Sequence, residues 1–532
     1  MNQIILNGFM ASGKTTIGRY LAERLNLPFV DLDHSIEIEQ GKSIASIFED
    51  AGEAHFRALE SRKLLQCLSQ DGVLALGGGT LLNPQNLQAV LQTDCLLVNT
   101  RCDVNDIMKR VQNEDGTRPL LAGDPNGIPD KIRSLLQQRE TVYNQYDIQI
   151  NSSTTSPEEA ANLIQAFLGI RQIRINHPGG YYPIWMGRNL LHRIGEMILA
   201  RREVKRIAIV TNPIVCALYG HVVQKSLETT GIETVLIEIP DGEEGKTLQT
   251  VNHIYDALTA FKADRSSMLL ALGGGITGDI GGFAAATYMR GIPLIQVPTT
   301  WLSMVDSSIG GKTGANLPQG KNLIGAFKQP EMVIMDFDVL ATLPKDELLN
   351  GFGEFIKHGL IADADLVQQI MAAGKTVSEL PDHPKFEQMV AQSLMVKANI
   401  VAKDPYEKKE RMLINFGHTL AHAIEKASHY EIAHGEAVIM GMWFAAVLSN
   451  KVGDFSDEDL NQIDTIYNQY QLPRSMHELS KEELLRYMGL DKKKSTNEYR
   501  WILLHKIGEA YIENYSSLEK IASLLDEMGA GA

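Results

Sequence analysis

The chain of 532 residues is 44% hydrophobic and 22% charged, the composition of a soluble globular protein, which excludes the disordered and fibrous classes. Its net charge of -15 and pI near 5.5 disfavour nucleic acid or an anionic membrane as the main partner, because both attract basic surfaces. Since a domain usually holds about 100–200 residues, this length predicts three or four domains.

The cysteines and the first residues predict a cytoplasmic protein. Cys67, Cys95, Cys102 and Cys216 form no CxxC pair and no disulfide framework, as expected in a reducing compartment. Residues 1–8 read as a strand that runs into a glycine-rich loop, without the basic and long apolar segments of a signal peptide. No later run reaches the roughly 18 apolar residues that span a bilayer, so no membrane partner is expected.

Short apolar runs alternate with helical patterns up to about residue 168, the βαβ order of a parallel sheet covered by helices. Strands are predicted at residues 4–6, 29–31, 73–76 and 95–99. An amphipathic helix over residues 158–168 closes this region, so the first domain boundary is expected at 169–172.

A second α/β pattern follows from about residue 173 to 340, with strands predicted at 206–211, 234–239, 268–272 and 294–297. After Leu343 and Pro344 the β-rich runs fade, and long helical patterns dominate to the end of the sequence. The predicted order is therefore α/β, then α/β, then mainly α.

A P-loop, GFMASGKT, occupies residues 8–15 between a predicted strand and a predicted helix. In this motif the loop amides point at phosphate oxygens, Lys14 neutralises the β- and γ-phosphate charge, and the Thr15 hydroxyl holds Mg²⁺. The sequence therefore predicts a nucleotide site. Its expected ATP contacts are Gly8, Ala11, Ser12, Gly13, Lys14, Thr15 and Thr16.

Two aspartates, Asp31 and Asp33, stand two residues apart at the end of the next predicted strand, so their side chains would point the same way. One could order the water shell of Mg²⁺ while the other engages an acceptor hydroxyl. A solvated turn or a helix cap explains the pair equally well.

Three arginines suggest how an acidic acceptor would be held. Arg57 and Arg139, with the close backbone approach that glycines 77–79 permit, could clamp a small carboxylate. Arg118 lies in a stretch that looks like a lid, and a lid arginine that closes on the transferring phosphate is a recurring device.

Residues 1–168 resemble shikimate kinase, with GFMASGKTT, VDLDHSIE, GEAHFRALE, LALGGGT, GTRPLLAG and QQRETVYNQYD in family order. The resemblance implies a P-loop kinase domain over residues 1–170 that phosphorylates shikimate with ATP and Mg²⁺, with Lys14 and Arg118 on the nucleotide. It implies that Asp31 supports Mg²⁺ and that Asp33 lies beside the hydroxyl that is phosphorylated. Thr80 stands where alanine is commoner, a difference expected to have no effect. The shikimate-binding residues would be Asp33, Arg57, Gly78, Gly79 and Arg139.

Two alternatives to a shikimate kinase are another small-molecule kinase and a nucleotide-gated regulatory module. The joint presence of Asp33, Arg57, Arg118 and Arg139 favours a catalytic domain, because a silent one would be expected to lose one of them.

Glycine-rich segments in the second region suggest an anionic ligand. The run GGGITGD, residues 273–279, follows an apolar strand and could present amides to a pyrophosphate, although a structural turn explains it as well. Lys312, Asn316, Lys321 and Asn322 stand in glycine-rich loops, where they would suit an oxygen-rich anion or be ordinary surface residues.

Three of the four histidines within residues 418–434, namely His418, His422 and His434, favour a metal site. His418 and His422 are four residues apart on one predicted helix face, and His434 follows soon after. A zincin protease is excluded because a threonine, not a glutamate, follows the first histidine. Spacing alone makes the first two histidines joint ligands and leaves the site to be completed by Glu354 or Glu436.

Residues 173–532 resemble 3-dehydroquinate synthase, with GGGITGDIGGF, YMRG, QVPTTWLSMVDSSIGGKTGANLPQGKNLIGAF, LATLP, GEFIKHG, NFGHTLAHAIE, HGEAV and a late DKK. The resemblance implies a Rossmann-like α/β domain that binds NAD over residues 173–340. It also implies a mainly α-helical metal-binding domain over residues 341–532.

The resemblance changes the metal assignment: the ligands of Zn²⁺ or Co²⁺ become Glu354, His418 and His434, and His422 becomes a substrate contact. The catalytic residues would be Lys312, Lys357, Glu407, Asn415 and His422. Further substrate contacts would be Arg290, Asp306, Asn322, Lys397, Arg411 and Lys493. The NAD contacts would be Asn212, Glu243, Lys246, Gly274, Gly275, Asp279, Thr299, Thr300, Lys321 and Thr342.

The implied synthase reaction makes no net use of NAD⁺. The cofactor takes a hydride from the C5 alcohol of 3-deoxy-D-arabino-heptulosonate 7-phosphate while zinc polarises the oxygen, phosphate leaves, and the hydride returns before ring opening and aldol closure. A metal-dependent polyol dehydrogenase or another sugar phosphate cyclase are the alternatives. Arg290, Lys312 and Lys321 favour a phosphorylated substrate.

The two resemblances together imply a bifunctional enzyme of the shikimate pathway of aromatic amino acid biosynthesis. Its two steps are not consecutive, so two independent sites are expected, without transfer of product between them. A family arginine at the position of Arg290 reaches across subunits, so a homodimer through the synthase part is expected.

Overall fold

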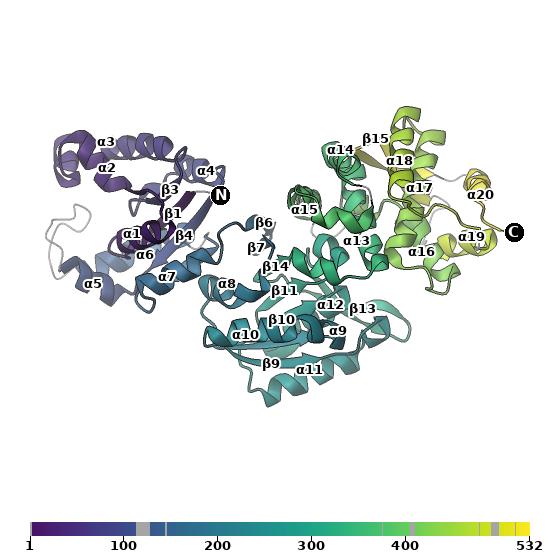
Figure 1. Cartoon of the computed structure of the whole chain (residues 1–532), viewed down its shortest axis with the longest axis horizontal. Coiled ribbons are helices and arrows are strands. Elements are labelled where there is room, and N and C mark those ends of the chain that lie inside the picture. Colours follow the sequence, from purple (N-terminus) through teal and green to yellow (C-terminus); the bar gives the residue numbers. More distant parts are fainter. Residues whose placement is uncertain are drawn as a thin grey trace. The chain divides into compact units, whose positions relative to one another are not determined.

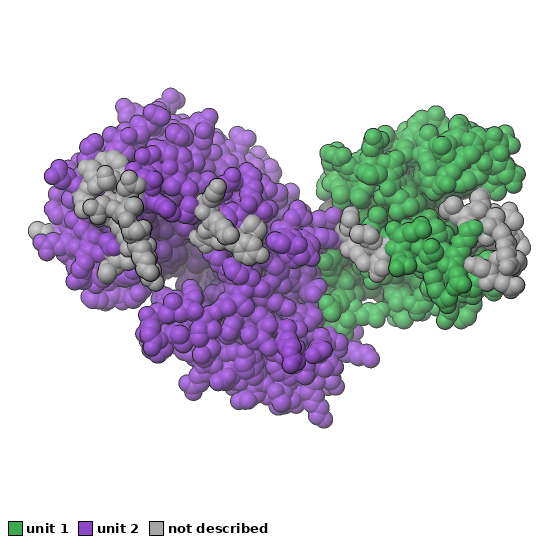
Figure 2. Space-filling model, turned by 180° about the vertical axis from the view of Figure 1, so that it is seen from behind, with its two compact units in different colours: residues 1–169, 193–204 green, residues 170–192, 205–532 purple. Residues whose placement is uncertain are grey.

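The computed structural model describes residues 3–112, 128–143, 146–374, 376–404, 410–477, 479–490, 499–515 and 518–531. The chain forms two compact units (Figures 1 and 2). Unit 1 holds Met1–Gly169 with Arg193–Val204, and unit 2 holds Ile170–His192 with Lys205–Ala532. Among the described residues, every helix is too short or too polar to cross a membrane.

Unit 1 is built on a five-stranded, all-parallel sheet in the order β2-β3-β1-β4-β5, as the alternating pattern predicts. β1 lies in the middle, so the P-loop that follows it leaves the centre of the sheet. The strands are β1 (Gln3–Gly8), β2 (Phe29–Asp31), β3 (Gly72–Ala75), β4 (Cys95–Arg101) and β5 (Ile148–Asn151).

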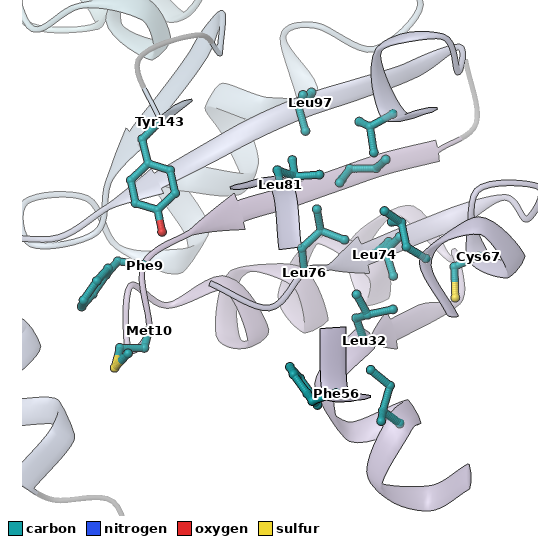
Figure 3. Close-up of a cluster of buried hydrophobic side chains, with 14 of the residues drawn as sticks. Phe9, Met10, Leu32, Phe56, Cys67, Leu74, Leu76, Leu81, Leu97 and Tyr143 are labelled. Carbon is teal, nitrogen blue, oxygen red and sulfur yellow. The ribbon is translucent and has the colours of Figure 1, made fainter. Parts of the chain in front are cut away.

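Helices cover this sheet and bury its apolar side chains. Leu74 and Leu97 from the strands pack with Leu32 and Phe56 from the helices (Figure 3). Ser156 and Glu159 form a capping box that begins the helix expected near residue 158. The helices are α1 (Lys14–Leu25), α2 (Leu32–Gln40), α3 (Ile44–Cys67), α4 (Pro84–Leu91), α5 (Val104–Gln112), α6 (Ile128–Tyr143), α7 (Pro157–Gln165) and α8 (Ile194–Arg201).

Unit 2 contains a seven-stranded sheet in the order β6-β7-β14-β11-β10-β8-β9, parallel except for the β6–β7 hairpin. The four predicted strands are present as β8 to β11, whereas β6, β7 and β14 were not expected. The strands are β6 (Arg171–His177), β7 (Gly180–Gly187), β8 (Arg206–Thr211), β9 (Glu233–Glu238), β10 (Met268–Gly273), β11 (Leu294–Pro298) and β14 (Met332–Asp336).

The segment expected to form glycine-rich loops is an antiparallel hairpin, β12 (Lys312–Leu317) with β13 (Gly320–Phe327). Gly314 pairs with Gly325 across it, and a Cβ on either glycine would collide with the facing backbone. Glycine here permits close strand approach, while it removes the β-branched residues that usually mark a strand. The prediction of loops was therefore wrong.

The helices around the sheet of unit 2 are α9 (Pro213–Val215), α10 (His221–Thr229), α11 (Leu248–Ala260) and α12 (Gly275–Thr287). The rest of the unit is mainly helical, as predicted. Its helices are α13 (Lys345–Ala362), α14 (Ala364–Ala373), α15 (Phe386–Lys403), α16 (His418–Ala427), α17 (His434–Val452), α18 (Asp457–Gln469), α19 (Lys481–Leu490) and α20 (Leu518–Glu527).

One hairpin interrupts the helical region, although helical patterns were expected to continue to the end. It pairs β15 (Tyr499–Lys506) with β16 (Glu509–Tyr515). Gly508 turns the chain with a φ of 84°, a conformation that glycine adopts without strain.

Candidate active sites

The P-loop of unit 1 is a tight turn that contains several residues with positive φ. Gly8 and Gly13 have φ values of 144° and 88°, and Ala11 is also left-handed at 58°. The Lys14 ammonium donates to the carbonyl oxygens of Gly8 (3.0 Å) and Phe9 (2.8 Å), so the lysine arches over the loop. Helix α1 begins directly at Lys14 and directs its first amides to the same space, an arrangement that binds phosphate.

The two residues expected to support Mg²⁺ lie in direct contact. The Thr15 hydroxyl donates to Asp31 Oδ2 at 2.8 Å. Asp31 ends β2 and caps α2 by accepting from the His34 amide. Asp33 lies in the first turn of α2, so the expectation that both aspartates extend from a strand is wrong. The cap that the sequence offered as an explanation of Asp31 is present, and it leaves the predicted Mg²⁺ role of Asp31 as a prediction.

Asp33 has the properties of a base. The side chain is half-buried, and its Oδ1 atom is enclosed without a hydrogen-bond partner. Burial, followed by the negative charge of Glu60, raises the pKa of Asp33 to about 6, against the opposing charge of Lys14. An unsatisfied carboxylate of this basicity can accept a proton from a ligand hydroxyl.

A cavity of about 600 Å³ brings together the predicted acid-binding residues Arg57, Gly79 and Arg139. Arg57 is held on α3 by ion pairs with Glu60 (2.8 Å) and Glu53 (3.0 Å). The Arg139 guanidinium donates to the Gly78 carbonyl at 2.7 Å. The cavity is therefore lined by two fixed cations beside the glycine turn.

Sequence reasoning missed several side chains that hold these residues in place. Glu60 lies three residues after Arg57 on a helix, and that spacing could have indicated the pair. Arg110 donates to the Ala11 carbonyl of the P-loop at 3.0 Å, and Tyr143 donates to the Gly78 carbonyl at 2.7 Å. An isolated arginine on an amphipathic helix gives no such signal. The expected lid residue, Arg118, lies outside the described residues.

In unit 2, the glycine turn after β10 begins helix α12, as a dinucleotide site requires. Gly274 caps the helix and Gly275 is its first residue. The Thr299 amide donates to the Gly273 carbonyl, and the Thr300 side chain lies against Gly274. The predicted phosphate-side residues therefore share one helix N-terminus.

Lys246 connects this helix to the β12–β13 hairpin. Its ammonium donates to Asp279 Oδ2 on α12 at 2.5 Å and to Asn322 Oδ1 at 2.6 Å. Glu243 accepts from Asn316 at 2.7 Å. The amide of Asn316, which the sequence offered as a ligand contact, is thus engaged within the protein.

The other predicted NAD contacts are engaged with neighbouring side chains of the protein. Asn212 caps α9 and donates to Asp241. The Thr342 hydroxyl bonds to that of Tyr219 at 2.5 Å, and the Lys321 ammonium lies 4.4 Å from the centre of the Tyr430 ring.

A cavity of about 640 Å³ contains most of the predicted substrate contacts. Its lining includes Asp306, Lys312, Asn322, Lys357, Lys397, Arg411, Asn415 and His418. Arg290 is exposed and does not belong to the described lining, while Glu407 and Lys493 lie outside the described residues.

Three helices bring Glu354, His418 and His434 together beside this cavity. One ligand atom of each lies within 4.8 Å of the others. Glu354 Oε1 is buried without a hydrogen-bond partner, and it lies 3.6 Å from His418 Nε2. Burial, then the charge of Lys357, holds the pKa of His418 well below its usual range, so its imidazole is neutral. A neutral imidazole and an unsatisfied carboxylate fit a divalent metal ion.

Neither His422 nor Glu436 belongs to this three-residue group. The His422 ring centre lies 5.6 Å from that of His418 and 6.3 Å from that of His434. Sequence reasoning missed Glu425, which lies 3.4 Å from His434 Nδ1 and would orient that ring.

Buried lysines flank the group on its cavity side. Lys357 contacts Glu354, and Lys397 contacts Asp306 at 2.5 Å. Desolvation opposes ionisation of Asp306, but the charges of Lys397 and then Lys357 prevail and hold its pKa well below the usual range. The cavity floor therefore carries fixed charges of both signs.

Comparison with known proteins finds different families in the two units of the chain. The family model for shikimate kinase matches residues 10–168. Those for the N-terminal and C-terminal parts of 3-dehydroquinate synthase match residues 236–350 and 351–494. The chain is 43% identical over 352 residues to the 3-dehydroquinate synthase of Nitrosospira multiformis, covering 66% of this chain and 96% of that protein. It is 42% identical over 333 residues to that of Syntrophotalea carbinolica, covering 62% and 92%.

Solved structures of two other synthases share the fold of unit 2. A 2-deoxy-scyllo-inosose synthase complexed with carbaglucose-6-phosphate, NAD⁺ and Co²⁺ is similar with a TM-score of 0.61 and 26% identity, covering 67% of this chain and 100% of that one. The 2-epi-5-epi-valiolone synthase of Streptomyces hygroscopicus, with NAD⁺ and Zn²⁺ bound, gives 0.60 and 28%, covering 65% and 96%. The chain therefore belongs to the 3-dehydroquinate synthase family, and its residues 10–168 form a domain of the shikimate kinase family.

Proposed function

We propose that the two cavities are the separate active sites of this bifunctional shikimate-pathway enzyme. The site in unit 1 transfers a phosphoryl group from ATP to shikimate. The site in unit 2 converts 3-deoxy-D-arabino-heptulosonate 7-phosphate to 3-dehydroquinate and releases phosphate. The family matches support this pair of reactions, and the geometry supports the residue roles below.

In the kinase, the enclosed oxygen of Asp33 is the observation that carries the proposal. Asp33 accepts the proton of the attacking hydroxyl, while Arg57 and Arg139, which line the cavity, hold the shikimate carboxylate. Lys14 would contact the β- and γ-phosphates in place of its backbone acceptors, and Thr15 and Asp31 would hold Mg²⁺. Arg118, which lies outside the described residues, stays the predicted ATP contact.

In the synthase, the convergence of Glu354, His418 and His434 carries the proposal. These residues would hold Zn²⁺ or Co²⁺, and the N-terminus of α12 would hold the NAD⁺ pyrophosphate. When bound, the metal polarises the substrate alcohol and the nicotinamide exchanges a hydride with it.

The chain's own residues then bind and orient the sugar phosphate. Lys312, Arg411 and Asn415 line the cavity and offer donors to phosphate and hydroxyl oxygens. His422, which is not among the described lining, and Glu407, which lies outside the described residues, complete the proposed set. Lys357 contacts Glu354 and fixes its carboxylate, and Lys397 keeps Asp306 ionised. Asp306 thereby remains an acceptor for a substrate hydroxyl throughout the cycle.

A related sugar phosphate cyclase is the second candidate for unit 2, because the similar solved structures are synthases of other products with NAD⁺ and Co²⁺ or Zn²⁺ bound. Incubation with the heptulosonate phosphate, NAD⁺ and Zn²⁺ tests the assignment. Phosphate release and 3-dehydroquinate without net NADH are expected. Accumulation of NADH would indicate a dehydrogenase instead.

The two sites are proposed to work independently. Full-length protein assayed with both substrates should lose only shikimate phosphorylation in the Lys14→Ala variant. It should lose only phosphate release from the heptulosonate in Glu354→Ala. Loss of both activities in either variant contradicts independence.

We also propose a homodimer in which Arg290 completes the partner's synthase site. Arg290 and Met289 are exposed, with left-handed φ values of 68° and 50°, and neither belongs to the described lining of the cavity in their own chain. Arg290→Ala and Lys357→Ala chains should each be inactive as synthases. After mixing and reassociation, about a quarter of wild-type activity should return, because each heterodimer regains one intact site. No recovery contradicts this arrangement.

The proposed location is the cytoplasm. All four cysteines are free thiols in the structure, as in proteins of reducing compartments.

A further inference from the structure

Thr80 was expected to be an inconsequential variation, but its hydroxyl lies within a buried polar network. Its side chain is fully enclosed, and Oγ1 lies 2.6 Å from Glu60 Oε1 and 3.0 Å from the Gly77 carbonyl oxygen. The Asn86 side chain donates to the Thr80 carbonyl at 2.9 Å. The backbone and the side chain of Thr80 are therefore both fixed.

The hydroxyl proton has two acceptors, and the Glu60 carboxylate is the closer and the charged one. A hydrogen bond to an ionised acceptor is stronger than one to a neutral carbonyl, so Thr80 donates to Glu60. Glu60 is only 1% exposed, and its other oxygen accepts from Arg57 at 2.8 Å. Each oxygen of this buried carboxylate thus has its own partner.

The position of Glu60 matters for two neighbours. Its Oε1 atom and Asp33 Oδ1 converge, because a Cβ on Gly77 would lie 2.7 Å from both. Arg57 also packs closely on Gly79, which leaves the guanidinium little room to move. Without the Thr80 hydroxyl, Glu60 Oε1 would lose its hydrogen-bond donor. It would then form a hydrogen bond either to Arg57 or to a proton shared with Asp33, and either new bond would displace the arginine.

We propose that Thr80 is a positioning residue of the kinase, whose hydroxyl fixes Glu60 and, through Glu60, the Arg57 guanidinium that receives the acceptor's carboxylate. This inference rests on the proposed kinase function. It assigns a role in acceptor binding to a residue that touches neither the acceptor nor ATP. The alternative is a threonine that merely satisfies the glycine turn by bonding to Gly77.

Two substitutions separate these roles. Thr80→Val keeps the shape but removes the hydroxyl, whereas Thr80→Ser keeps the hydroxyl. In the valine variant the KM for shikimate should rise about tenfold, because the buried carboxylate loses a hydrogen bond. Its kcat should change less than about threefold, and its KM for ATP should stay unchanged. The serine variant should restore the KM for shikimate to within about twofold of wild type.

A double-mutant cycle tests the path through Glu60. In the Glu60→Gln background, Thr80→Val should no longer change the KM for shikimate. An unchanged KM in the single valine variant, or an equal rise in the Glu60→Gln background, overturns the proposal. Failure of the wild-type chain to phosphorylate shikimate would instead overturn the kinase function itself, so the two failures are distinguishable.

Discussion

Each proposed active site has an aspartate, Asp33 in the kinase and Asp306 in the synthase, and neighbouring groups move the pKa values of the two in opposite directions. Asp33 has an enclosed, unpartnered oxygen, and burial together with Glu60 raises its pKa to about 6. Asp306 contacts Lys397, and lysine charges hold its pKa low although desolvation opposes them. Desolvation raises the pKa of both carboxylates; it prevails at Asp33, whereas the lysine charges overcome it at Asp306, so the balance between burial and nearby charge separates a base from a fixed anion.

The largest effect is expected at the metal group of the synthase. Glu354→Gln removes the anionic ligand and leaves the Lys357 charge buried without its partner. Phosphate release should fall roughly a thousandfold or more, and bound zinc should fall with it. Elemental analysis and a phosphate assay measure both. Glu436→Gln, outside the group, is the control and should keep its zinc; equal zinc loss there would contradict the assignment.

The corresponding change in the kinase is Asp33→Asn, which keeps the shape and removes the base. Shikimate phosphorylation should fall about 10²–10⁴-fold in kcat, the usual contribution of a general base. Phosphate release by the synthase in the same preparation should not change. Asp50→Asn, at an exposed ion pair with Lys42, is the matched control. Retention of more than about a tenth of kcat would exclude Asp33 as the base.

Most strand positions in the two large sheets were predictable because buried parallel strands are mainly apolar runs. β8, β10 and β11 are of this kind. The short run of β14 carried the same signal and was overlooked. The β12–β13 hairpin gave a contrary signal, because the glycines that let its strands approach are residues that usually mark turns.

The site was predictable where a motif fixes geometry and not where tertiary packing does. The P-loop and the helix of His418 follow from local sequence. Spacing paired His418 with His422, but the structure pairs it with Glu354 and His434, which come from two other helices. Glu60 and Thr80 were missed because a buried carboxylate and its hydroxyl partner look like surface residues in the sequence.

A smaller effect is expected from breaking the lysine–aspartate pair of the synthase. Lys397→Met leaves Asp306 without its closest cation, so the free energy of unfolding of unit 2 should fall by about 1–3 kcal/mol. The loss is smaller than for a fully enclosed pair because Asp306 opens to the cavity. Tryptophan fluorescence follows this unit selectively, because it holds all four tryptophans of the chain: Trp185, Trp301, Trp443 and Trp501.

Lys403→Met is the control for that measurement. The Lys403 Nζ atom lies 3.7 Å from Glu410 Oε2, and both side chains are exposed. This variant should therefore change the unfolding free energy by less than about 1 kcal/mol. Equal losses in the two variants would show that the pair with Asp306 contributes nothing beyond an exposed one.

The smallest effect concerns the pH dependence of the kinase. Since Asp33 must be ionised to accept a proton and its pKa is about 6, kcat/KM for shikimate should rise with pH and level off above that value. The charge of Glu60 raises this pKa. Glu60→Gln should therefore move the midpoint to lower pH, even if it also changes the maximum value of kcat/KM. Glu53 is the other ion-pair partner of Arg57, and its charge does not contribute to the raised pKa of Asp33. Glu53→Gln should therefore leave the midpoint in place. A midpoint that moves equally in both variants would mean that Arg57, and not the proximity of Glu60, sets the basicity of Asp33.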